Sequence, residues 1–196
     1  MTDTDRRPAL YEAYGHAADI VAGIRPEQLS GPTSCPAFDV AGLVDHIVGA
    51  GHRAAALGRG ETPVGDEFPH IELSDAPDEL ARGRKEAEAG WADDARLSAT
   101  TTMPWGEVYV GSTLVDMYLA ELAAHAWDLA SATGQLERLD DGGLAVTALE
   151  GARSMLKPEY RNVMEPGSPF GSEVEAPADA TDWERLAAFM GRPPRP

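Results

Sequence analysis

Cysteine is almost absent from this chain, since Cys35 is the only one among its 196 residues. An intrachain disulfide is therefore excluded, and with it the small secreted folds that depend on such bridges. A structural zinc site is also disfavoured, because sites of that kind usually take several thiolates. Any metal in this protein would have to be held mainly by histidine and carboxylate side chains.

Basic residues are scarce as well. The chain has 16 Lys and Arg residues against 33 Asp and Glu residues, and its formal net charge is −17. Binding to nucleic acid or to an anionic membrane surface requires a basic face, so we expect neither kind of partner. The simplest interpretation of this acidity is that it keeps the protein in solution.

Long hydrophobic runs are missing too. No stretch approaches the roughly 20 apolar residues that a membrane-spanning helix needs, and the first eight residues are polar with no apolar signal core. With 43% hydrophobic residues the composition is that of an ordinary globular protein. We expect a cytoplasmic protein that folds as a single domain over residues 1–196.

Apolar residues recur along most of the chain at steps of three and four, which is the period of an α-helix with one buried face. Asp39 and Ser112 are predicted N-caps, Gly134 a helix stop, and Thr181 with Glu184 a capping box. The predicted helices cover about residues 10–24, 39–58, 78–97, 112–132 and 143–156, with a short last helix after Thr181.

Two segments do not follow the helical period. Residues 100–110 favour β-structure around a Pro-Trp-Gly turn, which predicts a short hairpin or an extended crossing segment. Repeated prolines predict an irregular connection over residues 157–180. The whole pattern predicts an all-α helix bundle with a hairpin insertion and an extra C-terminal helix.

The strongest predicted helix carries a carboxylate and an imidazole four residues apart. Glu121 and His125 therefore lie on one face, which points toward the bundle interior. Burying both without a partner costs several kcal/mol, and a divalent cation would compensate them. His46 borders the apolar face of another helix and is the best third ligand. Two histidines and one carboxylate suit a catalytic type of metal site with open positions.

Other interpretations of these residues stay open. Glu121 and His125 could form a surface pair, and His46 could be a partly buried histidine bonded to the backbone. Asp128 lies on the same face as His125 and could orient it, or could bond to another helix. Cys35 precedes a helix start, where a thiolate is favoured, yet a small buried side chain is the simpler interpretation.

Several local motifs resemble one known group of proteins. They resemble the actinobacterial metal-binding proteins of the DinB-like superfamily, and also the N-terminal domain of mycothiol-dependent maleylpyruvate isomerase. The similarity covers the chain from about residue 10 to the last helix. It is carried by CPAFDVAGLVDH (35–46), WGE (105–107), GST (111–113), HAWDLASATG (125–134), FG (170–171) and RLAAFMGR (185–192).

The resemblance implies a four-helix bundle of up-down-down-up topology that holds one divalent metal ion, usually zinc or nickel. Its ligands would be His46, Glu121 and His125. Many members carry Asp at the position of Glu121, and the aromatic residue after Cys-Pro is usually Trp where this chain has Phe38. Bundles of this kind often dimerise, so a homodimer is also open.

The function implied is that of a metal- and thiol-dependent transferase or isomerase acting on a small electrophile. The metal would bind a low-molecular-weight thiol such as mycothiol as its thiolate. Arg53 and Arg59 could supply a local basic patch for such a cofactor. The alternatives are a non-catalytic metal-binding sensor or interaction domain, and a metal-dependent hydrolase of a small substrate with Asp128 as general base.

Overall fold

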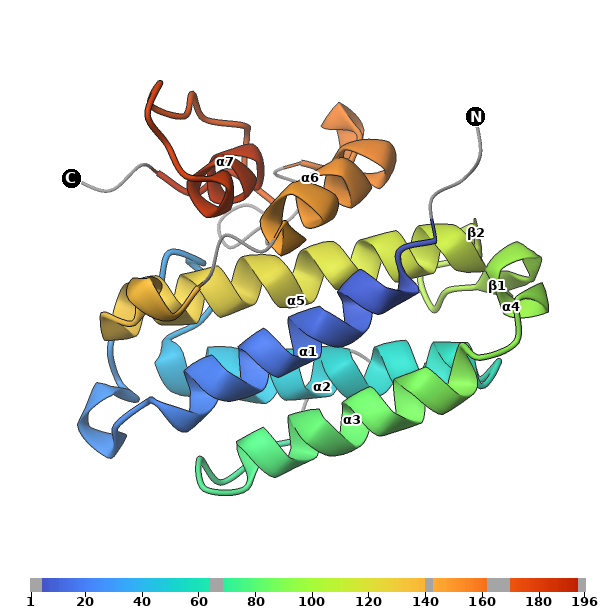
Figure 1. The fold of residues 1–196 in the computed structure, drawn as a ribbon, viewed down its shortest axis with the longest axis horizontal. Coiled ribbons are helices and arrows are strands. Elements are labelled where there is room, and N and C mark those ends of the chain that lie inside the picture. Colours follow the sequence, from blue (N-terminus) through green and yellow to red (C-terminus); the bar gives the residue numbers. More distant parts are fainter. Residues whose placement is uncertain (1–4, 64–68, 140–142, 162–169, 194–196) are drawn as a thin grey trace.

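Four long helices form the body of the molecule, and two shorter helices cover one side of it (Figure 1). The computed structural model describes residues 5–63, 69–139, 143–161 and 170–193. Its elements are α1 (Arg7–Ala22), η1 (Pro26–Gln28), α2 (Val40–Gly58), α3 (Ala76–Gly90), α4 (Ala95–Ser98), β1 (Thr100–Thr102), β2 (Val108–Val110), α5 (Gly111–Thr133), η2 (Leu136–Arg138), α6 (Leu144–Met155), η3 (Pro158–Tyr160) and α7 (Asp182–Phe189).

The four long helices are α1, α2, α3 and α5. In Figure 1, α1 and α5 run in one direction along the bundle, while α2 and α3 run in the other. Helices α1 and α2 each pack against both α3 and α5, so α1 and α2 lie on a diagonal of the bundle. The predicted all-α bundle of up-down-down-up topology is therefore confirmed.

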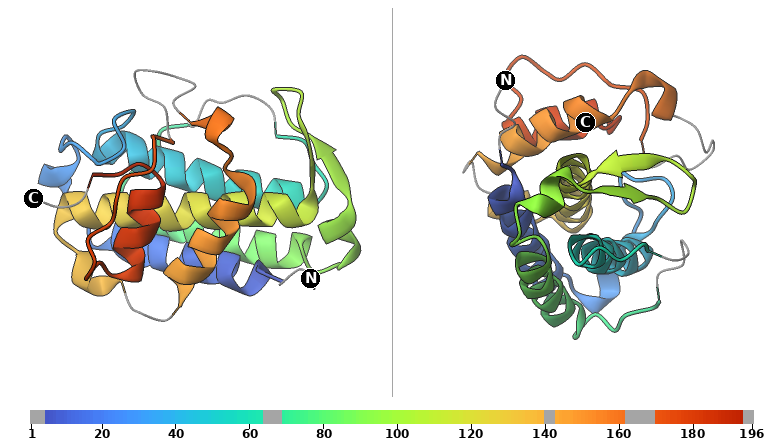
Figure 2. Two further views of the ribbon diagram at one scale, coloured as in Figure 1. Left: turned by 90° about the horizontal axis from the view of Figure 1, so that it is seen from above. Right: turned by 90° about the vertical axis from the view of Figure 1, so that its right-hand side faces the viewer.

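Helix α5 is the central element of the fold. It packs against α1 and α2 on one side, and α6 and α7 lie over its other side (Figure 2). Its sequence is accordingly apolar on nearly every face, as expected for a helix surrounded by protein. The polar side chains of α5 that face inward, among them His125 and Asp128, are therefore buried.

The predicted helix ends are largely confirmed. The side chain of Asp39 accepts a hydrogen bond of 2.8 Å from the backbone N–H of Gly42, which caps α2. Gly134 ends α5 in the left-handed region, with φ 72°. Thr181 and Glu184 form the predicted capping box at the start of α7.

The start of α5 differs from the prediction. The helix begins at Gly111, its N-cap is Val110 with extended backbone, and no side chain caps it. Ser112, the predicted cap, lies inside the first turn. Strand β2 runs directly into the helix, and the N–H of Gly111 donates to the carbonyl of Ala99 at 2.9 Å. The neighbouring backbone thus satisfies the first amide of the helix, and strand β2 leads into α5 without a side-chain cap.

The third predicted helix is also shorter than expected. Helix α3 ends at Gly90, and the short α4 follows, where the sequence predicted one helix from residue 78 to residue 97. A Cβ on Gly90 would lie 2.9 Å from the carbonyl carbon of Gly58, so α2 and α3 approach closely there. Trp91 then turns into the core, and its Nε1 donates to the carbonyl of Ala54 at 3.0 Å.

The predicted hairpin is present. Strands β1 and β2 pair in antiparallel register with Thr101 opposite Tyr109, and Gly106 takes φ 94° in the turn. Of the irregular connection predicted over residues 157–180, the part from 162 to 169 lies outside the described residues. None of the described helices is both long enough and apolar enough to cross a membrane.

Candidate metal centre

Two helices bring three potential ligands together. Helix α2 carries His46, and the facing helix α5 carries Glu121 and His125 one turn apart. Nε2 of His46 lies 2.7 Å from Oε1 of Glu121, and Nε2 of His125 lies 3.4 Å from the same oxygen. One donor atom from each of the three side chains lies within 4.8 Å of the other two.

The site is buried but not sealed. The His125 side chain is 2% exposed, while the side chains of His46 and Glu121 are 12% and 14% exposed. The exposed part of the cluster therefore belongs to the side chains of His46 and Glu121. The ring of Phe38 stacks on His46 with centroids 4.7 Å apart, and the two imidazoles meet edge to face at 4.8 Å.

The charges in the cluster are strongly coupled. Burial by itself would raise the pKa of Glu121, but the imidazoles of His125 and His46 hold it well below its usual range. Burial by itself would lower the pKa of His125, but Glu121 and Asp128 raise it to about 9. Without a metal ion, the cluster is thus a carboxylate compensated by a protonated imidazole.

This donor set fits a divalent cation. Two ligands of one zinc ion, each about 2.1 Å from it, can lie no more than about 4.2 Å apart. The separations of 2.7 and 3.4 Å from Glu121 to the two imidazoles fall inside that limit. Two nitrogens and one oxygen, with one side toward solvent, form the kind of set that leaves a position open for a further ligand.

Asp128 lies on the other side of the His125 ring. Its Oδ2 is 3.0 Å from Nδ1 of His125, so the interaction considered from sequence is present. The carboxylate is fully buried and also pairs with Arg192, whose Nη2 is 2.8 Å from the same oxygen. Arg192 was not singled out in the sequence, since no local pattern links it to a residue 64 positions earlier.

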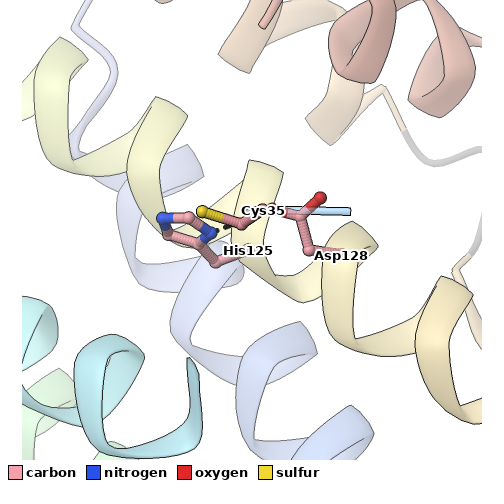
Figure 3. Close-up of side chains that lie close together, drawn as sticks. All are labelled: Cys35, His125 and Asp128. Carbon is pink, nitrogen blue, oxygen red and sulfur yellow. Dashed lines mark hydrogen bonds and ion pairs between the residues drawn. The ribbon is translucent and has the colours of Figure 1, made fainter. Parts of the chain in front are cut away.

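Cys35 forms a second group with His125 and Asp128, and Figure 3 shows the three side chains together. One donor atom of each lies within 4.8 Å of the others. The charge of Asp128 is already balanced by Arg192, so a cation here would meet a guanidinium instead of a free carboxylate. Burial also raises the pKa of the Cys35 thiol, which disfavours a thiolate. The His46 group is therefore the better cation site.

The remaining histidines lie apart from this cluster. His52 pairs with Glu79 at 2.9 Å, as expected for a residue on another face of α2. His70 is largely exposed and lies 3.1 Å from Asp45. His16 packs edge to face against Trp183, with ring centroids 5.8 Å apart.

The basic patch considered for Arg59 does not form near the ligands. Arg59 follows the last residue of α2 and pairs with Glu61 and Glu86. A buried cation, Arg192, is instead connected to the cluster through Asp128. A surface cavity of about 220 Å³ lies between η1, α2 and residues 70–74, and none of the three proposed ligands lines it.

The raised pKa of His125 predicts how the stability of the metal-free protein depends on pH. The folded value of about 9 lies above the usual 6.5, so the contribution is complete below pH 6.5 and is lost as the pH rises through 9. We expect a loss on the order of 3 kcal/mol from this group.

Urea unfolding of chelator-treated protein between pH 6.5 and 9.5 measures this effect. His52→Gln, which changes a histidine outside the cluster, should keep the same slope, and His125→Gln should flatten it. An equal slope in the His125→Gln protein would show that another group is responsible.

Comparison with known proteins places the chain in a family. The model of the mycothiol maleylpyruvate isomerase N-terminal domain matches residues 11–130. Two uncharacterized proteins, from two strains of Mycobacterium tuberculosis, are each 35% identical over 179 residues, which covers 89% of this chain and 91% of theirs. No solved structure gives a significant match. The matched segment contains all three proposed ligands, and this chain belongs to the mycothiol maleylpyruvate isomerase N-terminal domain family, a DinB-like family.

Proposed function

We propose that the protein binds one divalent cation through Nε2 of His46, Oε1 of Glu121 and Nε2 of His125. The convergence of these three atoms from two helices is the observation that carries the proposal. Buried charges need compensation, and a doubly charged ion would replace the proton that otherwise holds the cluster together. Zinc and nickel both suit a site with two imidazoles and one carboxylate.

We further propose that the bound ion activates a small thiol, such as mycothiol, toward a small electrophile, in a transferase or isomerase reaction. When bound, the cation supplies a Lewis acid that lowers the pKa of a coordinated thiol. The chain belongs to a family that is named after a mycothiol-dependent isomerase, which supports this assignment. The partial exposure of His46 and Glu121 supports it too, because a thiol can approach from that side.

The protein residues have separate tasks in this scheme. Glu121 and His46 hold the solvent side of the site, and the ring of Phe38 shields the face of His46 that it covers. His125 holds the buried side and is itself held by Asp128. His46, Glu121 and His125 would hold the ion, and the thiol sulfur would be a further ligand beside them.

Hydrolysis by metal-activated water is less well supported. That reaction needs a general base beside the water, and Asp128 was the candidate from sequence. Asp128 is fully buried, accepts from Arg192 and bonds to His125 on the side of the ring away from Glu121. It is therefore not placed to take a proton from a molecule at the open side.

Calorimetric titration of the zinc-loaded protein with mycothiol tests the proposed activity. We expect saturable heat with one thiol per metal ion, and a new sulfur-to-metal absorption band when cobalt replaces zinc. S-methylated mycothiol, which cannot form a thiolate, is the matched control and should give no such band. If the fully metal-loaded protein shows neither heat nor an absorption band with mycothiol, the proposed thiol activation is wrong and only metal binding remains.

A further inference from the structure

A buried arginine from the end of the chain reaches the metal centre. Arg192 follows α7 and is 3% exposed. Arginine is rarely buried so deeply unless another group pairs with it. Its Nη1 donates to the carbonyl of Met190 at 2.9 Å, while Nε and Nη2 face Asp128. The guanidinium is thus aimed at one carboxylate on α5.

The contact between Arg192 and Asp128 is a forked ion pair. Nε of Arg192 lies 3.1 Å from Oδ1 of Asp128, and Nη2 lies 2.8 Å from Oδ2. Two parallel hydrogen bonds fix the plane of the carboxylate as well as its position. Oδ2 of Asp128 also lies 3.0 Å from Nδ1 of His125, so the arginine is connected to a proposed metal ligand through one residue.

This connection determines where His125 carries its hydrogen. Asp128 faces the Arg192 guanidinium with both of its oxygens, which is the geometry of an ionised carboxylate in an Arg pair. A carboxylate only accepts hydrogen bonds, so Nδ1 of His125 must be the donor. In the neutral ring that a cation requires, a hydrogen on Nδ1 would leave the lone pair of Nε2, on the side of Glu121, for the ion.

We propose that Arg192 is a positioning residue for the metal centre, which fixes the orientation and the Nδ1–H form of His125 by holding Asp128. The inference rests on the proposed function, since it takes His125 as a ligand. It also gives the C-terminal segment a role, although Arg192 lies beyond the residues 11–130 that match the family model. Without the guanidinium, the two bonds that fix the carboxylate of Asp128 would be lost, and its position beside Nδ1 of His125 would no longer be held.

A carboxylate that is no longer held would leave the His125 ring free to turn, so that Nε2 would spend less time in the orientation that faces the site. Loss of a residue that orients a ligand in this way typically weakens metal affinity about 10- to 100-fold. The expected effect of Arg192→Ala is therefore a zinc dissociation constant raised by that factor. Arg192→Lys keeps the charge without the fork and should fall between wild type and Arg192→Ala.

Arg6→Ala is the matched control. Arg6 makes a comparable pair with a carboxylate of the same helix, since its Nη1 lies 3.2 Å from both oxygens of Asp116. Asp116 is nine residues before His125 on α5, which is roughly 13 Å along the helix. Arg6→Ala should lower the free energy of unfolding without changing zinc affinity.

The experiment measures the zinc dissociation constant by competition with a chromophoric chelator, together with urea unfolding of each metal-free protein. Nitrogen-15 spectra of the zinc-loaded protein add a readout of His125, whose Nδ1–H should exchange slowly in wild type and faster in Arg192→Lys. If Arg192→Ala does not fold, Arg192→Lys decides the matter by the same measurements.

Failure of the two proposals would look different. A wild-type protein that does not bind zinc would overturn the proposed function. A wild-type protein that binds zinc, with unchanged affinity in the Arg192 variants, would overturn only the positioning role. Equal weakening in Arg6→Ala and the Arg192 variants would also overturn it, because the effect would then follow general stability.

Discussion

Replacing His125 by alanine is expected to reduce bound metal to background. The substitution removes a buried nitrogen ligand and leaves Glu121 with one imidazole, that of His46, at 2.7 Å. Two remaining ligands do not provide the three protein donors that such sites use. His46→Ala should have the same result, since it removes the donor from the facing helix. Elemental analysis of protein saturated with zinc and then desalted gives the stoichiometry directly.

His52→Ala is the matched control for these variants. His52 lies on α2 together with His46, is partly buried and pairs with Glu79 outside the cluster. It should retain one metal ion per chain. Circular dichroism of each metal-free variant separates loss of a ligand from loss of the fold. Retained stoichiometry in folded His46→Ala and His125→Ala proteins would contradict the ligand set.

Metal binding is also expected to stabilise the fold strongly. An ion that binds only the folded state stabilises it by about 4 kcal/mol when its free concentration is 1,000 times the dissociation constant. For a chain of 196 residues, that corresponds to a rise in Tm of roughly 10 °C. The proposed ion would connect two helices, because His46 lies on α2 while Glu121 and His125 lie on α5.

Thermal unfolding with excess zinc and with excess chelator measures this difference. The shift should vanish in His125→Ala and persist in His52→Ala. An equal shift in both variants would show that zinc stabilises the protein from some other place. A shift that is absent from wild type would mean that the cluster holds no ion under these conditions.

The fold could be predicted from local patterns where local chemistry determines it. Asp39 caps α2 because its side chain reaches an amide three residues ahead, and Gly134 ends α5 because glycine accepts positive φ at little cost. Prediction failed where a distant backbone group intervenes. The carbonyl of Ala99 accepts from the first amide of α5, one residue before the predicted cap Ser112, and the close approach of Gly58 and Gly90 accompanies the early end of α3.

The residues of the candidate site also fall into those that local sequence predicts and those that it does not. The spacing of Glu121 and His125 places them on one helical face, and family motifs add His46, so the three residues could be named without coordinates. The pairing of Asp128 with Arg192 could not, because it joins α5 to the segment after α7 across 64 positions. Tertiary packing alone brings these two side chains together, and no periodicity in the sequence carries that information.

The most direct test is the location of the ion itself. Crystals grown from protein that has not been exposed to chelator, measured at wavelengths on both sides of the zinc and nickel absorption edges, give an anomalous difference map that identifies and places the metal. We expect one strong peak at ligand distance from His46, Glu121 and His125. A peak between Cys35 and Asp128 instead, or a metal-saturated protein with no peak between α2 and α5, would contradict it.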